Sequence, residues 1–256
     1  MSIGIVRFYT FFLLQASFHI FLAYFFLHCI ITYKRLKFEY HKKGAFIVKV
    51  ILFNGSPNAH GCTYTALSEV AATLEKEGIE AEIFQIGNKA VRGCVGCGGC
   101  SKNEEHHCVY TEDTVNAAID KIKDADGFVF GSPVHFAGAS GFLTSFMDRL
   151  FWAGGSYLAY KPAACVASAR RAGTTVTLDQ ISRYFGIRNM PVISGSYWNM
   201  VHGGCPEDVK KDLEGLQTMQ NVGQNMAWIL KCIESGKQNG IERPVPVSGA
   251  KTNFIR

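Results

Sequence analysis

The stretch Val48-Lys49-Val50-Ile51-Leu52-Phe53-Asn54-Gly55-Ser56-Pro57 decides the fold of this chain. Its first six residues are a short, mostly apolar and β-branched run, which predicts a buried strand. A turn sequence follows, and a helical pattern then extends from about Thr63 to Lys76 and ends before Gly78. A strand, a loop and a helix in this order begin the unit from which parallel sheets are built.

The same alternation continues through the rest of the chain. Further apolar runs predict strands at 81–86, 127–130, 162–169 and 191–194. Amphipathic patterns predict helices at 111–123, 140–150, 174–185 and 206–233. Strands that alternate with helices of this length predict an α/β domain with a five-stranded parallel sheet covered on both faces.

Composition and charge limit the function classes. The 256 residues are 48% hydrophobic and 18% charged, as is usual for globular proteins. The formal net charge of +5 arises in residues 1–47, which hold six of the 26 basic residues and one acid, Glu39. Residues 48–256 therefore contain 20 basic and 20 acidic residues. A neutral domain gives no electrostatic ground for a nucleic-acid partner, and we exclude that class.

Residues 1–47 form a hydrophobic and basic N-terminal extension. The 26 residues from Phe8 to Tyr33 include no Asp, Glu, Lys or Arg, and this length can span a bilayer as one helix. Basic residues follow from Lys34 onward, so the positive-inside rule would hold the domain in the cytoplasm. The extension is thus a candidate membrane anchor.

The alternative, which we favour, is a mis-assigned start. Nine of the 19 Phe residues lie in 1–47, as expected of translated AT-rich DNA. The residues Lys43-Gly44-Ala45 can be encoded by a purine-rich ribosome-binding sequence, and Val48 can be a GTG start codon. The domain at 48–256 would then be cytoplasmic, without a membrane contact.

Three loops are expected at the carboxyl ends of strands, where open α/β sheets bind ligands. They are residues 55–65, 132–139 and 169–173. The first contains Ser56, Thr63 and Thr65 and runs into a helix N-terminus, where amides and the helix dipole attract phosphate. It has neither a P-loop nor a dinucleotide fingerprint, so a monophosphate is favoured. A plain turn with an N-cap is the alternative.

The loop 93–109 contains the cysteine run Cys94-x2-Cys97-x2-Cys100-x7-Cys108. Glycines at 93, 96, 98 and 99 allow its backbone to turn tightly around a bound group. This compact spacing favours a [4Fe-4S] cluster, whereas most zinc sites place two cysteine pairs far apart. A four-thiolate zinc site and a metal-free loop remain alternatives. We expect His106 and His107 to face solvent.

Several motifs together resemble the NADPH-dependent FMN reductase and iron-sulfur flavoprotein family. They are Gly55-Ser56-Pro57, Gly61-Cys62-Thr63, Ser132-Pro133-Val134-His135-Phe136-Ala137-Gly138, Asp148-Arg149-Leu150-Phe151, Ala169-Arg170-Arg171, Tyr197-Trp198-Asn199-Met200 and Thr252-Asn253-Phe254-Ile255-Arg256. The resemblance covers residues 48–256. It implies a flavodoxin-like three-layer sandwich with strand order 2-1-3-4-5, FMN held non-covalently, and a homodimer or homotetramer.

The resemblance also implies roles for individual residues. The FMN phosphate would be held by Ser56, Thr63, Tyr64 and Thr65. The isoalloxazine ring would be wrapped by Pro133, Val134, His135, Phe136 and Gly138. Relatives often have Asn where this chain has Cys62, and Tyr where it has His135. The His135 ring could still stack on the flavin, and an exposed loop residue is the alternative.

Two arginines and a tryptophan follow later strands. Arg170 and Arg171 come after a buried strand, where a cation could favour the anionic reduced flavin. A surface ion pair is the alternative for each. Trp198 could pack on the ring, on a neighbouring subunit or in the core.

Two functions are consistent with this pattern. In the first, an enzyme oxidises NAD(P)H and passes electrons through FMN to a quinone or a free flavin. In the second, a ferredoxin-like partner reduces the cluster, the cluster reduces FMN, and nicotinamide does not bind. A redox-sensing module is a third, weaker hypothesis. No catalytic acid, base or nucleophile is expected, because the flavin supplies the chemistry.

Overall fold

The computed structural model describes residue 28, residues 48–250 and residue 252. The chain divides into two compact units, residues 1–47 and 48–256, and only the second is described in detail. The membrane anchor expected between Phe8 and Tyr33 lies outside the described residues. Within the described residues, no helix combines the length and apolar character needed to cross a membrane.

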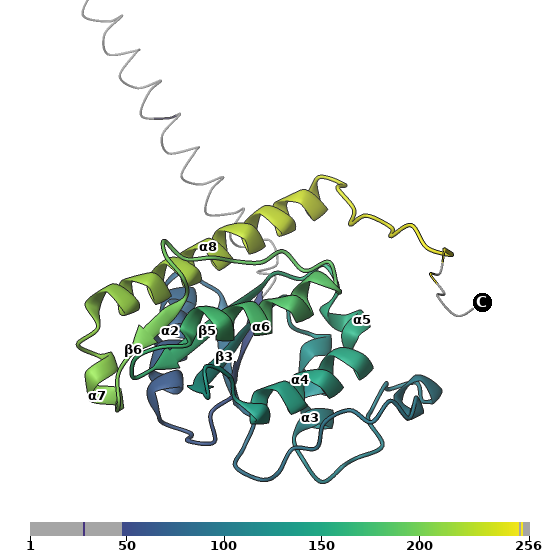
Figure 1. The fold of residues 1–256 in the computed structure, drawn as a ribbon. Helices are drawn as coiled ribbons and strands as arrows, with labels where there is room; N and C mark the ends of the chain where they lie inside the picture. The colour runs from purple at the N-terminus through teal and green to yellow at the C-terminus, as the bar shows by residue number, and fades with distance from the viewer. Residues whose placement is uncertain (1–27, 29–47, 251, 253–256) are drawn as a thin grey trace, which may run out of the picture. The chain divides into compact units, whose positions relative to one another are not determined.

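A parallel sheet of five strands lies at the centre of the described domain (Figure 1). Its strand order is β2 (Glu80–Gln85), β1 (Lys49–Asn54), β3 (Gly127–His135), β5 (Ala163–Ala169) and β6 (Met200–His202). The two-residue strand β4 (Gly138–Ala139) pairs antiparallel with the end of β3. Because β4 adds no parallel strand, the order is the predicted 2-1-3-4-5, and that prediction is confirmed.

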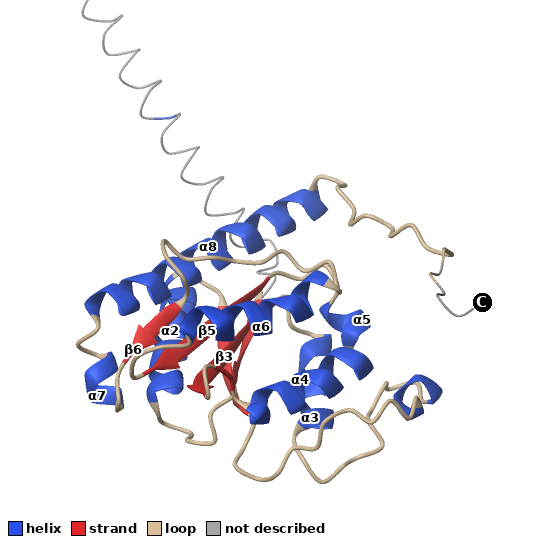
Figure 2. Cartoon of the chain, in the orientation of Figure 1, coloured by secondary structure: helices blue, strands red, loops and turns tan. Residues whose placement is uncertain are grey.

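Helices cover both faces of this sheet (Figure 2). One face is covered by α2 (Cys62–Lys76) and α8 (Leu213–Gln238), and the other by α3 (Val115–Lys123), α4 (Gly141–Ala153) and α6 (Thr174–Gly186). The short elements η1 (Gly99–Lys102), α5 (Gly155–Leu158) and α7 (Pro206–Val209) lie in connections. The domain is therefore the three-layer sandwich that was expected.

The apolar run in β1 is buried on both faces of the sheet. Val50 and Leu52 belong to the core formed with α2 and α8, whereas Ile51 and Phe53 belong to the core formed with α3, α4 and α6. Successive side chains of a strand point to opposite faces, which explains this division. The Phe53 ring also stacks on Phe130 of β3, with 4.9 Å between ring centroids. One short run thus anchors both layers of helices.

The predicted strand at 191–194 is wrong. Only Val192 forms a bridge, to Ala163, and the pairing ends after Ile193 because the Gly195 amide donates to Asn199 Oδ1 at 2.8 Å instead of to the neighbouring strand. The Asn199 side chain replaces part of the ladder, since its Nδ2 atom donates to the Cys165 carbonyl at 3.0 Å. The fifth parallel strand is instead β6, which pairs with the end of β5.

The predicted helix at 206–233 is two helices, α7 and α8. Asp212 ends the connection between them, because its carboxylate accepts a hydrogen bond from the Gly215 amide at 3.0 Å and caps α8. The other oxygen of this carboxylate accepts from the His202 amide at 2.7 Å. Asp212 therefore fixes the start of α8 beside β6.

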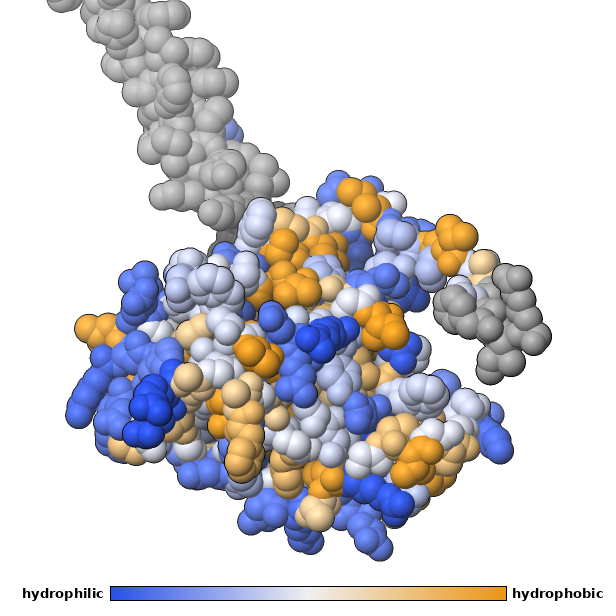
Figure 3. Space-filling view, viewed as in Figure 1, coloured by the Kyte–Doolittle hydropathy of each residue, from blue (hydrophilic) through white to orange (hydrophobic). Residues whose placement is uncertain are grey.

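Exposed hydrophobic residues lie on several elements and loops of the described domain. On the face seen in Figure 3, separate hydrophobic patches lie between hydrophilic residues. The exposed aromatic residues include Phe136, Trp152, Trp198 and Trp228, which belong to different elements and loops. This surface does not single out one subunit interface, and the homodimer or homotetramer stays a prediction.

Candidate functional site

Three loops meet at the carboxyl edge of the sheet, as predicted. The Gly55 amide donates to the Gly131 carbonyl at 2.8 Å, and the Ser140 hydroxyl donates to the Gly55 carbonyl at 2.9 Å. The hydroxyls of Thr63 and Ser168 lie 2.8 Å apart. These contacts join the loop after β1 to the ends of β3 and β5. The sheet therefore presents one continuous rim at the place where such folds bind ligands.

The N-terminus of α2 opens onto this rim with free amides. Its N-cap is Gly61, whose residue type supplies no capping side chain, and the first helical hydrogen bond runs from the Thr65 amide to the Gly61 carbonyl at 3.0 Å. The amides of Cys62, Thr63 and Tyr64 therefore lack an acceptor within the helix. Unpartnered first-turn amides at the positive end of the helix dipole suit a phosphate.

Three of the four residues with hydroxyls predicted beside this phosphate, Ser56, Thr63 and Thr65, already have a hydrogen-bond partner in the protein. Ser56 is buried, and its Oγ atom accepts from the Asn58 amide at 3.1 Å. The Thr65 hydroxyl donates to the Gly61 carbonyl at 3.2 Å, and Thr63 is paired with Ser168 as described. Among the described residues, the first-turn amides and the hydroxyl hydrogen of Ser56, whose oxygen only accepts here, are thus donors that the loop leaves unused.

A strained hairpin forms the second part of the rim. His135 pairs with Gly138, and the two residues between them, Phe136 and Ala137, have φ values of 49° and 61°. A two-residue turn with both φ values positive matches type I′, which usually contains Gly or Asn. The side chain of Phe136 is fully exposed. Such strain in non-glycine residues is concentrated at ligand sites in proteins.

Gly173, after β5, holds the hairpin in place. It has a φ of 95°, and a Cβ atom added there would lie 2.7 Å from Val134 Cγ1 and 2.8 Å from Ala137 Cα. Arg170 and Arg171, in the same loop, are exposed. The loop after β5 therefore lies against the hairpin, while contacts of the two arginines with a flavin stay a prediction.

The four cysteines of the predicted run line a single cavity. Its other walls include Val109, Tyr110, Arg149 and Trp152, and its volume is about 20 Å³. All four thiols are free, with Cys100 buried and Cys94 and Cys97 exposed. Burial raises the pKa of the Cys100 thiol, and the nearby sulfur of Cys108 raises it further. The fold thus gathers four thiols that are up to 14 positions apart in the sequence.

The four cysteine sulfurs are not arranged closely enough in this structure to coordinate one ion. Among the described residues, no group of three or more His, Cys, Asp or Glu side chains is close enough to hold an ion. The backbone around them has the predicted freedom, because Gly96 and Gly98 both adopt a φ of 68°. The thiols therefore surround a common space that would have to widen around a cluster.

Arg149 of α4 forms the inner wall of this cavity and was not predicted as a site residue. Its guanidinium donates to Cys108 Sγ at 3.2 Å, to the Tyr110 carbonyl at 2.7 Å and to the Asp113 carboxylate. Burial lowers the pKa of Arg149, but the hydrogen bonds to Asp113 and Cys108 outweigh this effect and raise it. The group is therefore a permanent buried cation beside a cysteine sulfur.

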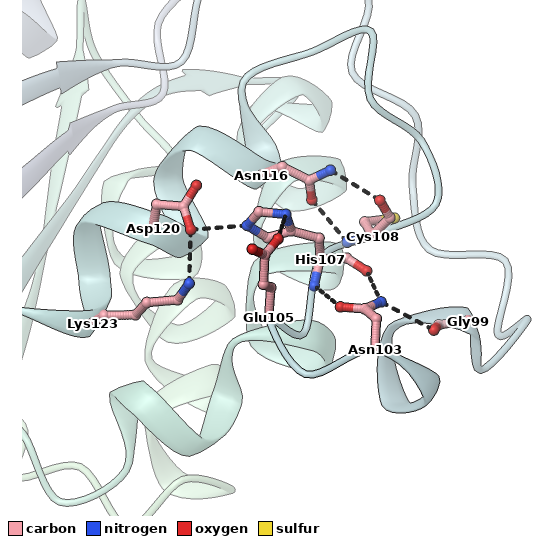
Figure 4. A network of polar contacts seen from close by, with 8 residues as sticks. All are labelled: Gly99, Asn103, Glu105, His107, Cys108, Asn116, Asp120 and Lys123. Carbon is pink, nitrogen blue, oxygen red and sulfur yellow. Dashed lines mark hydrogen bonds and ion pairs between the residues drawn. The ribbon is translucent and has the colours of Figure 1, made fainter.

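The backbone of Cys108 is held by α3 (Figure 4). The Cys108 amide donates to Asn116 Oδ1 at 2.8 Å, and Asn116 Nδ2 donates to the Cys108 carbonyl at 2.9 Å. Together with Arg149, these bonds fix both the main chain and the sulfur of one cysteine. The sequence gives Asn116 no role and includes Arg149 only within the motif 148–151, because the partners of each are brought together only by the tertiary structure.

His107 reinforces this attachment. Its ring lies 2.9 Å from Asp120 of α3 and 3.1 Å from Glu105, and its amide donates to Asn103 at 2.8 Å (Figure 4). His106 and His107, which we expected to face solvent, are partly exposed, and the His107 side chain keeps 27% of its surface accessible. The loop is thus docked on α3 through the His107 ring as well as through the backbone of Cys108.

Comparison with known proteins identifies the family. A family model described as NADPH-dependent FMN reductase matches residues 48–204. The chain belongs to the NADPH-dependent FMN reductase family. An iron-sulfur flavoprotein of Methanocaldococcus jannaschii is 35% identical over 195 residues, which cover 73% of this chain and 100% of that protein. The resemblance that the sequence motifs suggested is therefore confirmed, and this FMN reductase family member is a flavin oxidoreductase by family.

Solved structures support the fold of this FMN reductase family member. RosB with a bound 8-demethyl-8-formylriboflavin-5′-phosphate intermediate has a TM-score of 0.59 at 15% identity, over 82% of this chain and 92% of that one. The flavodoxin, WrbA-like protein from Agrobacterium tumefaciens has a TM-score of 0.51 at 17% identity. The match covers 73% of this chain and 98% of that one. Together with the strand order, these likenesses confirm the flavodoxin-like fold class.

Proposed function

We propose that this domain is an FMN-dependent NAD(P)H oxidoreductase that carries a [4Fe-4S] cluster on Cys94, Cys97, Cys100 and Cys108. The observation that carries the proposal is that these four thiols line one cavity, in a domain whose helix α2 presents free amides at the ligand-binding rim. Relatives named iron-sulfur flavoproteins support it.

The rim fits FMN. The first-turn amides of α2 and the side chains of Ser56, Thr63, Tyr64 and Thr65 would hold the phosphate. The ring would be surrounded by Pro133, Val134, His135, Phe136 and Gly138, with Arg170 and Arg171 at its edge. FMN supplies the hydride and single-electron chemistry when it is bound. The protein's part is to position the ring, exclude water and provide positive charge at the rim.

The cysteine loop fits an iron-sulfur cluster in its donor chemistry. Four thiolates from one short segment are the usual ligand set of a [4Fe-4S] cluster. The left-handed glycines Gly96 and Gly98 allow the segment to turn between consecutive cysteines. Zinc stays an alternative ligand, because four thiolates also suit that ion.

The electron donor is tested by steady-state kinetics. Full-length protein, prepared without oxygen and loaded with FMN, is mixed with NADPH or NADH and with a quinone or free flavin as the acceptor. We expect at least one nicotinamide to be oxidised, and no oxidation by the same protein stripped of FMN. If neither nicotinamide is oxidised while reduced ferredoxin bleaches the flavin, the protein is an electron carrier and not an NAD(P)H reductase.

A further inference from the structure

Arg149 is a charged side chain that is almost completely buried. Its exposed fraction is 1%, and it is among the largest fully buried side chains of the described residues. An isolated buried charge is very unfavourable, so the partners of such a group show what it stabilises. All of its hydrogen-bond partners lie between residues 92 and 113, the segment that contains the four cysteines.

The guanidinium of Arg149 makes hydrogen bonds to several points along this segment. Nη1 donates to the Arg92 carbonyl at 3.3 Å and to the Asp113 carboxylate, and Nη2 donates to the Tyr110 carbonyl at 2.7 Å. The guanidinium also lies 5.6 Å from the centre of the Tyr110 ring. These contacts tie both ends of the cysteine segment to α4, which is packed in the core.

The remaining bond is directed at a sulfur. Nε donates to Cys108 Sγ at 3.2 Å, while Asn116 holds the Cys108 backbone at its amide and its carbonyl. A neutral thiol is a weak acceptor, whereas a thiolate accepts a strong, charge-assisted hydrogen bond from a guanidinium. The geometry therefore suits a Cys108 sulfur that carries negative charge, as a metal-bound sulfur does.

We propose that Arg149 is a positioning residue that presents the Cys108 sulfur and raises the reduction potential of the cluster. The inference rests on the proposed function, because it requires a cluster on this loop. Reduction adds negative charge to a cluster, so a cation and a hydrogen bond at a ligating sulfur favour the reduced form. Arg149 would thereby set how readily the cluster accepts an electron.

The test is an anaerobic redox titration of the full-length protein, with the cluster followed by electron paramagnetic resonance. Arg149→Lys keeps the charge but removes the Nε donor and the planar fork. We expect the equilibrium between oxidised and reduced cluster to move about tenfold toward the oxidised form, a shift of about 59 mV for a one-electron couple. The matched control is Arg92→Lys, because Arg92 is exposed and its guanidinium contacts the Tyr110 ring instead of a sulfur. Its potential should equal that of the wild type.

A second variant shifts the potential in the opposite direction. Asp113→Asn removes the carboxylate that offsets the charge of Arg149 but leaves the bond to Cys108 in place. We expect its cluster to be reduced at a more positive potential than that of the wild type. This variant decides the question if Arg149→Lys does not fold.

The outcomes separate the two proposals. A wild-type protein that takes up neither iron nor sulfide overturns the proposed cluster, and this inference with it. A wild-type cluster whose potential is unchanged by both Arg149→Lys and Asp113→Asn overturns this inference alone. Opposite shifts in the two variants, with Arg92→Lys unchanged, support it.

Discussion

The Nε atom of Arg149 lies 3.2 Å from the Sγ atom of Cys108, although the two residues are 41 positions apart in the chain. Arg149 belongs to α4, which covers the sheet, and Cys108 belongs to the loop between β2 and α3. The contact therefore connects the rigid part of the domain to the segment that we propose to hold a cluster. Asn116 makes the corresponding connection from α3.

The first prediction concerns Asn116. Replacing it with Ala removes both hydrogen bonds to the Cys108 backbone and leaves part-buried polar groups without partners. We expect the free energy of unfolding to fall by about 1–3 kcal/mol, as measured by urea denaturation. Asn88→Ala is the control, because Asn88 is exposed and should change stability little. Equal urea midpoints for the two variants would contradict the anchoring role of Asn116.

The second prediction concerns the phosphate site at α2. Cys62→Asp places a carboxylate in the first helical turn, where it should stabilise the helix but repel a phosphate. We expect FMN affinity to fall about fivefold or more, because like charges a few ångströms apart repel by about 1 kcal/mol even in water. Riboflavin, which has no phosphate, is the control ligand. Flavin fluorescence titration should show that the affinity for riboflavin is unchanged. An equal loss of affinity for FMN and for riboflavin would contradict a phosphate site at the N-terminus of α2.

The third prediction concerns the glycine that supports the hairpin. Gly173→Ala puts a methyl group within 3 Å of Val134 and Ala137 and forces Ala into a φ of 95°. We expect the protein to lose about 1–3 kcal/mol of stability and to bind FMN more weakly. The matched control is Gly141→Ala, where an added Cβ meets nothing within 4 Å. Thermal unfolding measures the stability and FMN titration measures the affinity. Equal stability and equal FMN affinity of the two variants would contradict a supporting role of Gly173 for the hairpin.

The fourth prediction concerns the pH dependence of Cys165. Burial raises the pKa of its thiol from 9.0 to about 12. The unfolded thiol therefore ionises at a pH where the folded thiol keeps its proton. Stability that is complete below pH 9 should fall as the pH rises toward 12, by up to about 1.4 kcal/mol per pH unit from this group.

Two measurements check this prediction. In urea denaturation, Cys165→Ala should weaken the loss of stability between pH 9 and 12. In the native protein, an alkylating reagent should modify the exposed Cys205 and Cys232 but leave Cys165 unmodified. Rapid alkylation of Cys165 under native conditions would show that it is not buried as described.

Much of the fold could be predicted because local patterns and tertiary structure agree. The apolar run of β1 and the turn at Asn54-Gly55-Ser56-Pro57 predict a strand, a loop and a helix, and all three are present. The strand at 191–194 failed for a physical reason. Its composition is apolar, but the Asn199 side chain accepts from the Gly195 amide and donates to the Cys165 carbonyl, so the backbone pairing ends after Ile193. Such a substitution of side chain for backbone leaves no local pattern.

The site was predictable to a similar extent. The compact cysteine spacing predicted a shared ligand, and the four thiols do line one cavity, while the ligand itself stays a prediction. The roles of Arg149 and Asn116 were not predictable, since a charged or polar residue on a helix is usually exposed. Only the packing of α3 and α4 against the cysteine loop shows that both side chains are directed at Cys108.

The central claim is that one domain holds both FMN and a [4Fe-4S] cluster, and the most direct test is a chemical analysis of the full-length protein purified without oxygen. Iron, acid-labile sulfide and flavin are measured per chain, with Cys100→Ser as the matched variant. The account predicts about four iron and four sulfide ions with about one FMN in the wild type, and loss of iron and sulfide but not of FMN in the variant. A wild-type protein that retains FMN and contains no iron or sulfide would contradict it.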